Sequence, residues 1–110
     1  MKVLLIVPPS TMEERYGSFQ EAGAIYPSMG LASIAACAER AGYAVTVIDA
    51  EASGLSMEAI RARLSELQPD VIGMQTFCAN LERCHAVATA ARKLCPQAKI
   101  VLGGVQVTMF

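Results

Sequence analysis

Two kinds of apolar pattern alternate along this chain, and their alternation limits the fold more than any other feature. Four short runs rich in Val, Ile and Leu have the length and composition of buried β-strands. Three longer segments between them repeat apolar residues at the three- and four-residue spacing of an α-helix. The predicted strands are Lys2–Val7, Tyr43–Ile48, Asp70–Met74 and Ala98–Leu102.

Residues that favour helix ends frame the three helical segments. A serine or asparagine precedes each of them, where its side chain can accept a hydrogen bond from a free backbone N–H. A glycine or proline follows each of them, where a helix cannot readily continue. The predicted N-caps are Ser28, Ser56 and Asn80, and the predicted stops are Gly42, Pro69 and Pro96.

Strands that alternate with helices pair in parallel through right-handed crossovers. We therefore predict an α/β fold with an open, doubly wound, Rossmann-like parallel sheet of strand order 2-1-3-4. A length of 110 residues allows one domain, and 54% apolar against 17% charged residues excludes intrinsic disorder. That apolar share is high for a domain that covers its own core.

Charge and hydropathy exclude several classes of partner. A net charge of −1 gives no electrostatic reason to expect nucleic acid or an anionic membrane, and no apolar run approaches a membrane span. The apolar start is too short for a signal peptide, because Pro8 and Pro9 interrupt it. The cysteines lack C-x-x-C or zinc spacing, which favours reduced thiols in a cytoplasmic protein. They are Cys37, Cys78, Cys84 and Cys95.

The fold class places a ligand beyond the carboxyl ends of the strands, near the reversal of strand order. Residues 8–27, 75–80 and 103–108 form the loops expected there. The first loop is about 20 residues long, well above the usual length, and such loops are often functional. Its aromatic residues either cover an apolar or planar ligand or pack back on the domain. They are Tyr16, Phe19 and Tyr26.

Three common uses of such a fold lack their motifs. NAD and FAD are unfavoured because Pro8-Pro9-Ser10 stands where a glycine-rich turn would approach pyrophosphate. The chain has no P-loop motif. A phosphoreceiver domain would need an aspartate at the end of the third strand, where Met74 and Gln75 stand.

Gly103-Gly104 is the most specific local feature. The pair either lets backbone approach a ligand or forms a tight turn where the strand ends. Asp49 lies where a ribose-binding acid often stands, but without a glycine-rich turn a capping role is favoured. Gln75, Thr76 and Thr108 can donate hydrogen bonds at the rim.

No set of residues assembles a catalytic acid, base and nucleophile. His85 is the only histidine, and it lacks partners at metal-ligand spacing, so a metal site is not expected. The residues alone therefore predict a binding module.

Several segments, in order along the chain, resemble the N-terminal cobalamin-binding domain of cobalamin-dependent radical SAM proteins. That family includes methyltransferases and the anaerobic magnesium-protoporphyrin monomethyl ester cyclases. The segments are Pro27–Leu31, Ile34–Ala36, Glu39–Tyr43, Val45, Ile48–Ala50, Pro69–Gly73, Lys93–Pro96 and Ile100–Thr108.

The resemblance implies a module that holds cobalamin at the carboxyl ends of the strands and is not catalytic alone. The nucleotide tail would need room, which the small side chains of Ala35, Ala36 and Ala38 could leave. S-adenosylmethionine and a [4Fe-4S] cluster would belong to a downstream domain, because C-x-x-x-C-x-x-C is absent here. The implied cofactor contacts are Pro8, Pro9, Gln75, Thr76, Phe77, Gly103, Gly104, Val105, Gln106 and Thr108.

Two departures from related patterns bear on these contacts. Gln106 stands where the family often has a histidine. The mutase and methionine synthase class carries D-x-H-x-x-G after the first strand, but residues 8–17 contain no histidine, so a cobalt ligand of that kind is excluded.

The resemblance also implies that residues 1–110 are a C-terminally truncated part of a larger enzyme, a transferase or cyclase. A complete domain would add a helix, a fifth strand and a final helix. Without them the fourth strand is an open edge, which predicts a homodimer through that side. Two alternatives remain: a degenerate domain used for docking or oligomerisation without cofactor, and another doubly wound domain that binds a different small molecule.

Overall fold

The strands pair in parallel in the order β2-β1-β3-β4, which confirms the predicted topology. The computed structural model describes residues 1–9, 29–76 and 81–104. The strands in these ranges are β1 (Lys2–Val7), β2 (Ala44–Asp49), β3 (Val71–Gln75) and β4 (Lys99–Gly103). The helices are α2 (Met29–Arg40), α3 (Ala50–Ser53), α4 (Met57–Leu67) and α5 (Leu81–Leu94).

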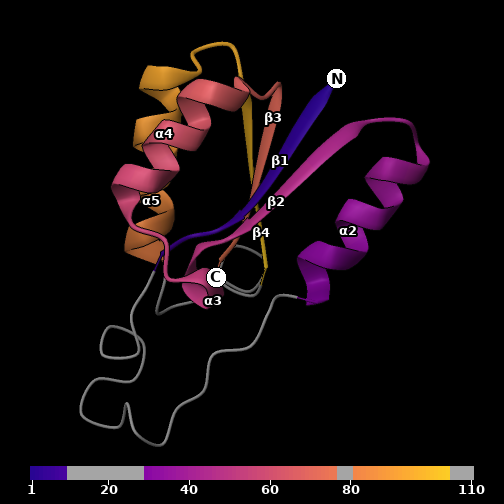
Figure 1. Cartoon of the computed structure of the whole chain (residues 1–110), viewed down its shortest axis with the longest axis horizontal. Helices are drawn as coiled ribbons and strands as arrows, with labels where there is room; N and C mark the ends of the chain where they lie inside the picture. The colour runs from indigo at the N-terminus through magenta and orange to yellow at the C-terminus, as the bar shows by residue number, and fades with distance from the viewer. Residues whose placement is uncertain (10–28, 77–80, 105–110) are drawn as a thin grey trace, which may run out of the picture.

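The sheet lies between helices on its two faces (Figure 1). Helices α4 and α5 pack side by side on one face, and α2 packs against β1 and β2 on the other. The central strand β1 serves both faces, because successive side chains of a strand point in opposite directions. Leu4 and Ile6 join the core under α4 and α5, whereas Leu5 and Val7 join the core under α2.

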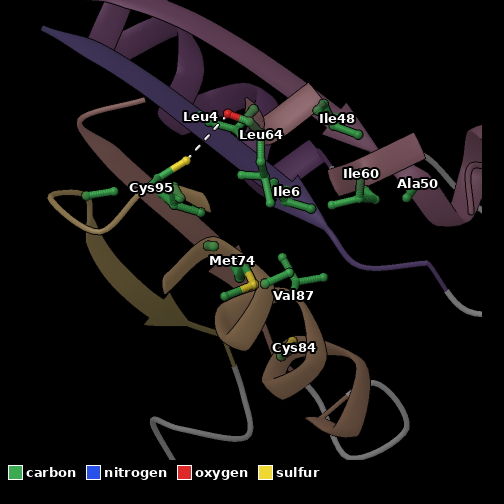
Figure 2. Packing of buried hydrophobic residues seen from close by; sticks show 14 residues of the cluster. Leu4, Ile6, Ile48, Ala50, Ile60, Leu64, Met74, Cys84, Val87 and Cys95 are labelled. Atoms are coloured by element: carbon green, nitrogen blue, oxygen red, sulfur yellow. Dashed lines mark hydrogen bonds between the residues drawn. The ribbon is translucent and has the colours of Figure 1, made fainter. Parts of the chain in front are cut away.

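The core under α4 and α5 is the larger of the two (Figure 2). Ile60 and Leu64 of α4 and Val87 of α5 are fully buried in it. The Cys95 thiol at the end of α5 donates to the carbonyl oxygen of Leu64 at 3.4 Å, which ties the two helices together. This side carries most of the buried apolar surface that stabilises the fold.

The core under α2 covers only part of its face. Leu31 and Ala35 of α2 pack there with Leu5 and Val7. Helix α2 lies over β2 and β1, so the same face of β3 and β4 has no helix over it among the described residues. Val101 of β4 is consequently 55% exposed.

The helix ends follow the predicted signals where they are described. Ser56 caps α4, since its hydroxyl oxygen accepts from the N–H of Ala59 at 3.2 Å. Gly42 has a φ of +95° after α2, and the N–H of Tyr43 turns back to the carbonyl of Ala38 at 3.1 Å. This pattern is a Schellman motif. The predicted caps Ser28 and Asn80 lie outside the described residues.

The predicted element bounds differ from the structure in small ways. Strand β2 begins at Ala44 rather than Tyr43, because the N–H of Tyr43 is used by the end of α2. Strands β3 and β4 each begin and end one residue later than predicted. The short helix α3 was not predicted, and Asp49 caps it by accepting from the N–H of Ala52 at 3.0 Å. The capping role favoured for Asp49 is thus confirmed.

A membrane-crossing helix would have to be longer and more apolar than any found in the described ranges.

Candidate functional site

Two hydrogen bonds from one residue join the carboxyl ends of β3 and β4. Gln75 pairs with Gly103 in the strand register. The N–H of Thr76 donates to the carbonyl oxygen of Gly103 at 2.7 Å, and the Thr76 hydroxyl donates to the same oxygen at 2.8 Å. The Thr76 side chain is buried. Four of the residues predicted to contact cofactor are therefore brought together at one junction: Gln75, Thr76, Gly103 and Gly104.

The two glycines of the pair have different roles. Gly104 has a φ of +98°, and a Cβ there would lie 2.6 Å from the carbonyl oxygen of Thr76. The strand-exit interpretation therefore holds for Gly104. At Gly103 the φ is not positive, and a Cβ would meet nothing within 4 Å among the described residues. Nothing in the described part of the chain requires a glycine at position 103.

A groove of about 390 Å³ lies on the α2 face of the sheet and reaches the junction of β3 and β4. Strand β1 lines it with Val3 and Leu5, and α2 lines it with Leu31 and Ile34. Its walls are mainly apolar, which suits the apolar part of a ligand. The remaining lining residues are Gly30, Val71, Gly73, Met74, Gln75, Val101, Gly103 and Gly104.

Glycines from three elements line this groove, and they do so for different reasons. At Gly30 of α2 and Gly103 of β4, a Cβ would meet nothing within 4 Å in the residues that the structure describes, and neither glycine has a positive φ. At Gly73 of β3, a Cβ would lie 2.9 Å from Cδ2 of Leu5. Gly73 is therefore explained by packing against Leu5, whereas Gly30 and Gly103 leave space that side chains could fill.

The remaining predicted contacts have more varied positions. Pro8 and Pro9 follow β1 at the same edge of the sheet, since β1 and β3 run parallel with Ile6 opposite Met74. Pro8 is fully buried and Pro9 is half-buried. Phe77, Val105, Gln106 and Thr108 lie outside the described residues, as do Tyr16, Phe19 and Tyr26.

The space that we expected for the nucleotide tail beside the alanines of α2 lies beside other residues of that helix. Ala35 is buried in the core under α2, and Ala36 is exposed. Neither of them lines the groove, and nor does Ala38. The open space instead follows Gly30, Leu31 and Ile34, nearer the start of α2.

A buried thiol of α5 contacts the same junction, a feature that the sequence analysis did not single out. Cys84 of α5 donates to the carbonyl oxygen of Gln75 with a sulfur–oxygen distance of 3.6 Å. Burial raises the pKa of the Cys84 thiol to about 11, so it is neutral at pH 7 and is not an activated nucleophile. The only sequence signal was its place on the apolar face of α5.

His85 follows Cys84 but is exposed on α5. It forms no group of three metal-binding side chains within the part of the chain that the structure describes.

Comparison with known proteins identifies the family of this chain. The model of the B12-binding domain family, described as "B12 binding domain", matches residues 18–110. The chain is also similar to a curated protein from Pyrococcus horikoshii that is named an uncharacterised methyltransferase, with 28% identity over 108 residues. That alignment covers 98% of this chain but 22% of the relative, so the chain spans about a fifth of the relative's length. No solved structure matches the chain significantly. Since the family model covers most of its length, the chain belongs to the B12-binding domain family.

Proposed function

We propose that this chain is the cobalamin-binding module of a larger, methyltransferase-type radical SAM protein. The module holds cobalamin over the carboxyl ends of β1, β3 and β4 and contributes no catalytic group of its own. The observation that carries the proposal is the groove on the α2 face, which is lined by two glycines, Gly30 and Gly103, that no contact with the described residues requires.

Gly30 and Gly103 give this observation its weight. Glycine weakens helices and strands because it has the most backbone freedom to lose on folding. Gly30 is the second residue of α2 and Gly103 the last residue of β4, and alanine would fit at both positions. A ligand that occupies the groove would explain why both positions are glycine, because a larger side chain at either would take up its space.

The groove and the junction suit different parts of cobalamin. The apolar wall formed by Leu5, Leu31 and Ile34 would take the planar base of the nucleotide tail. The junction of Gln75, Thr76, Gly103 and Gly104 would underlie the corrin, together with Pro8 and Pro9. When bound, cobalamin supplies methyl-transfer or radical chemistry at its cobalt.

The larger protein is inferred from the relative and from the cysteines. The Pyrococcus relative carries the name methyltransferase and is several times longer than this chain. S-adenosylmethionine and a [4Fe-4S] cluster would be bound by a downstream domain, because the cysteines at 37, 78, 84 and 95 do not form C-x-x-x-C-x-x-C. The free thiols of Cys37, Cys84 and Cys95 fit a cytoplasmic location.

Binding of hydroxocobalamin to the purified 110-residue chain tests the proposal. The protein and the cofactor are mixed, separated by gel filtration and examined by visible absorption. We expect the corrin bands to elute with the protein. The absence of any corrin absorption in the protein peak would overturn the proposal.

A pair of substitutions in α2 tests whether the groove is the site. Gly30→Leu places a side chain in the groove and should weaken cobalamin binding by about tenfold or more. Ala36→Leu is the matched control, because Ala36 is exposed on the same helix and does not line the groove. Equal affinity of the two variants would contradict a tail-binding role for the groove.

A second candidate function is docking or oligomerisation without cofactor. Its specific support is the exposure of apolar side chains on the edge strand β4, where Val101 is 55% and Leu102 is 42% exposed. This function predicts self-association of a chain that retains no cobalamin.

A further inference from the structure

We propose that Thr76 is a positioning residue for the cofactor: its buried hydroxyl holds the ends of β3 and β4 together, so that the backbone of Gly103 and Gly104, which lines the groove, is fixed in place. This inference rests on the proposed cobalamin site and adds a residue that acts on the ligand through the backbone of Gly103 and Gly104.

The first support is that two donors of one residue meet one carbonyl. The Thr76 N–H and hydroxyl lie 2.7 and 2.8 Å from the carbonyl oxygen of Gly103. The N–H bond alone would continue the strand pairing by one residue. The hydroxyl bond is additional, and the burial of Thr76 protects it from exchange with water.

The second support is the contact of Gly104 with the Thr76 backbone. A Cβ at position 104 would lie 2.6 Å from the Thr76 oxygen and 2.9 Å from its nitrogen. Gly104 is therefore a glycine because the chain turns directly over the Thr76 peptide. Its φ of +98° also requires a glycine, because other residues rarely adopt a positive φ.

The third support is that β3 is held from a second side. The Cys84 thiol of α5 donates to the carbonyl oxygen of Gln75, the residue before Thr76. The segment Gln75–Thr76 is thus fixed both to β4 and to the first turns of α5. Figure 2 shows Cys84 on α5 together with Met74 of β3.

The functional consequence is preorganisation of the site. Gln75, Gly103 and Gly104 line the groove and meet at this junction. A ligand that binds against backbone already fixed in place loses less free energy in ordering it. Removal of the Thr76 hydroxyl should therefore weaken cobalamin binding even though the hydroxyl is already used within the protein.

The test compares Thr76→Val with Thr76→Ser in the 110-residue chain. Valine keeps the shape of threonine but removes the donor, whereas serine keeps the donor. We expect Thr76→Val to weaken hydroxocobalamin binding by about five- to tenfold, the effect of one hydrogen bond, and Thr76→Ser to restore affinity to within about twofold of wild type.

Amide hydrogen exchange at position 76 gives a readout that needs no cofactor. We expect slow exchange in the wild type and in Thr76→Ser, and faster exchange in Thr76→Val, because the bond to Gly103 loses its neighbour. If exchange and affinity are the same in Thr76→Val as in wild type, Thr76 has no positioning role.

A second pair of variants keeps the test valid if Thr76→Val does not fold. Gly104→Ala combines a positive φ with a clash against Thr76, whereas Gly42→Ala has a φ of +95° and open space, at the opposite end of the sheet. Both lose stability, but only Gly104→Ala should also weaken cobalamin binding, by about tenfold or more. Equal affinity of the two would overturn the inference.

Failure of the inference is distinct from failure of the proposed function. Wild type that binds no cobalamin overturns the proposed function and the positioning role with it. If wild type binds cobalamin and both Thr76→Val and Gly104→Ala bind it equally tightly, only the positioning role is overturned.

Discussion

Buried thiols act in this protein as small core side chains that also donate hydrogen bonds. Cys84 reaches the Gln75 carbonyl, and Cys95 reaches the Leu64 carbonyl. Both side chains are buried, and burial raises the pKa of each thiol because the thiolate would lose its solvation. The Leu64 carbonyl oxygen also accepts from the N–H of Gln68 at 3.0 Å, so the Cys95 thiol is an additional donor to it.

The pKa of Cys84 predicts a loss of stability in alkaline solution. Its pKa rises from an ordinary 9.0 to about 11 on folding, so the unfolded chain ionises first as the pH rises. The free energy of unfolding keeps the full contribution of Cys84 below pH 9 and loses it progressively between about pH 9 and 11. Urea unfolding in the presence of a reductant, repeated across this range, measures the decline.

Two cysteine variants isolate this effect. Cys84→Ala removes the titrating group, so its stability should decline less steeply above pH 9 than that of wild type. Cys37→Ala removes an exposed thiol from α2 and should keep the wild-type slope. The same slope in Cys84→Ala and wild type would show that Cys84 does not titrate as described.

At the scale of single elements, α4 depends on its N-cap. The Ser56 hydroxyl oxygen accepts from the N–H of Ala59, one of the N–H groups that the first helical turn leaves without a partner. Ser56→Ala should lower the free energy of unfolding by about 1 kcal/mol. Urea or thermal unfolding at constant pH measures the change.

Ser65→Ala is the matched control for the cap. Ser65 is exposed within the same helix, where alanine is the better helix former. This variant should therefore be as stable as wild type or slightly more stable. A loss of stability in Ser65→Ala as large as in Ser56→Ala would contradict the capping argument.

The elements were largely predictable because their signals are local. The cap at Ser56, the turn at Gly42 and the apolar run of β1 each depend on residues close together in the sequence. Helix α3 was missed because four residues carry no periodicity, although Asp49 did supply its capping signal. Local signals thus predicted the strands and the three longer helices, but not the short helix α3.

The site was less predictable because its contacts are distant in sequence. The Gly103-Gly104 pair left two interpretations open, and the structure supports the tight turn for Gly104 but not for Gly103. The difference depends on Thr76, which lies 27 residues before Gly103 and which no local pattern links to it. The groove likewise lies where α2 covers β1 and where no helix of the described residues covers the same face of β3 and β4.

At the scale of the whole molecule, the two faces of the sheet are covered unequally. Two helices cover one face, whereas α2 covers part of the other. Ile34 and Val101, on opposite sides of the groove, are each 55% exposed. The high apolar share of the sequence is thus explained in part by apolar side chains that the described chain does not bury.

This exposure predicts self-association of the chain in the absence of cobalamin. An apolar edge strand favours contact with another copy, because burial of its side chains removes apolar surface from water. Val101→Lys places a charge at the exposed edge and should shift the chain toward monomer.

Val47→Lys is the control, since Val47 is 43% exposed on the opposite edge strand, β2. Sedimentation velocity across a wide range of concentrations measures the distribution. A wild-type chain that stays monomeric at high concentration, or equal association of the two variants, would rule out association through β4.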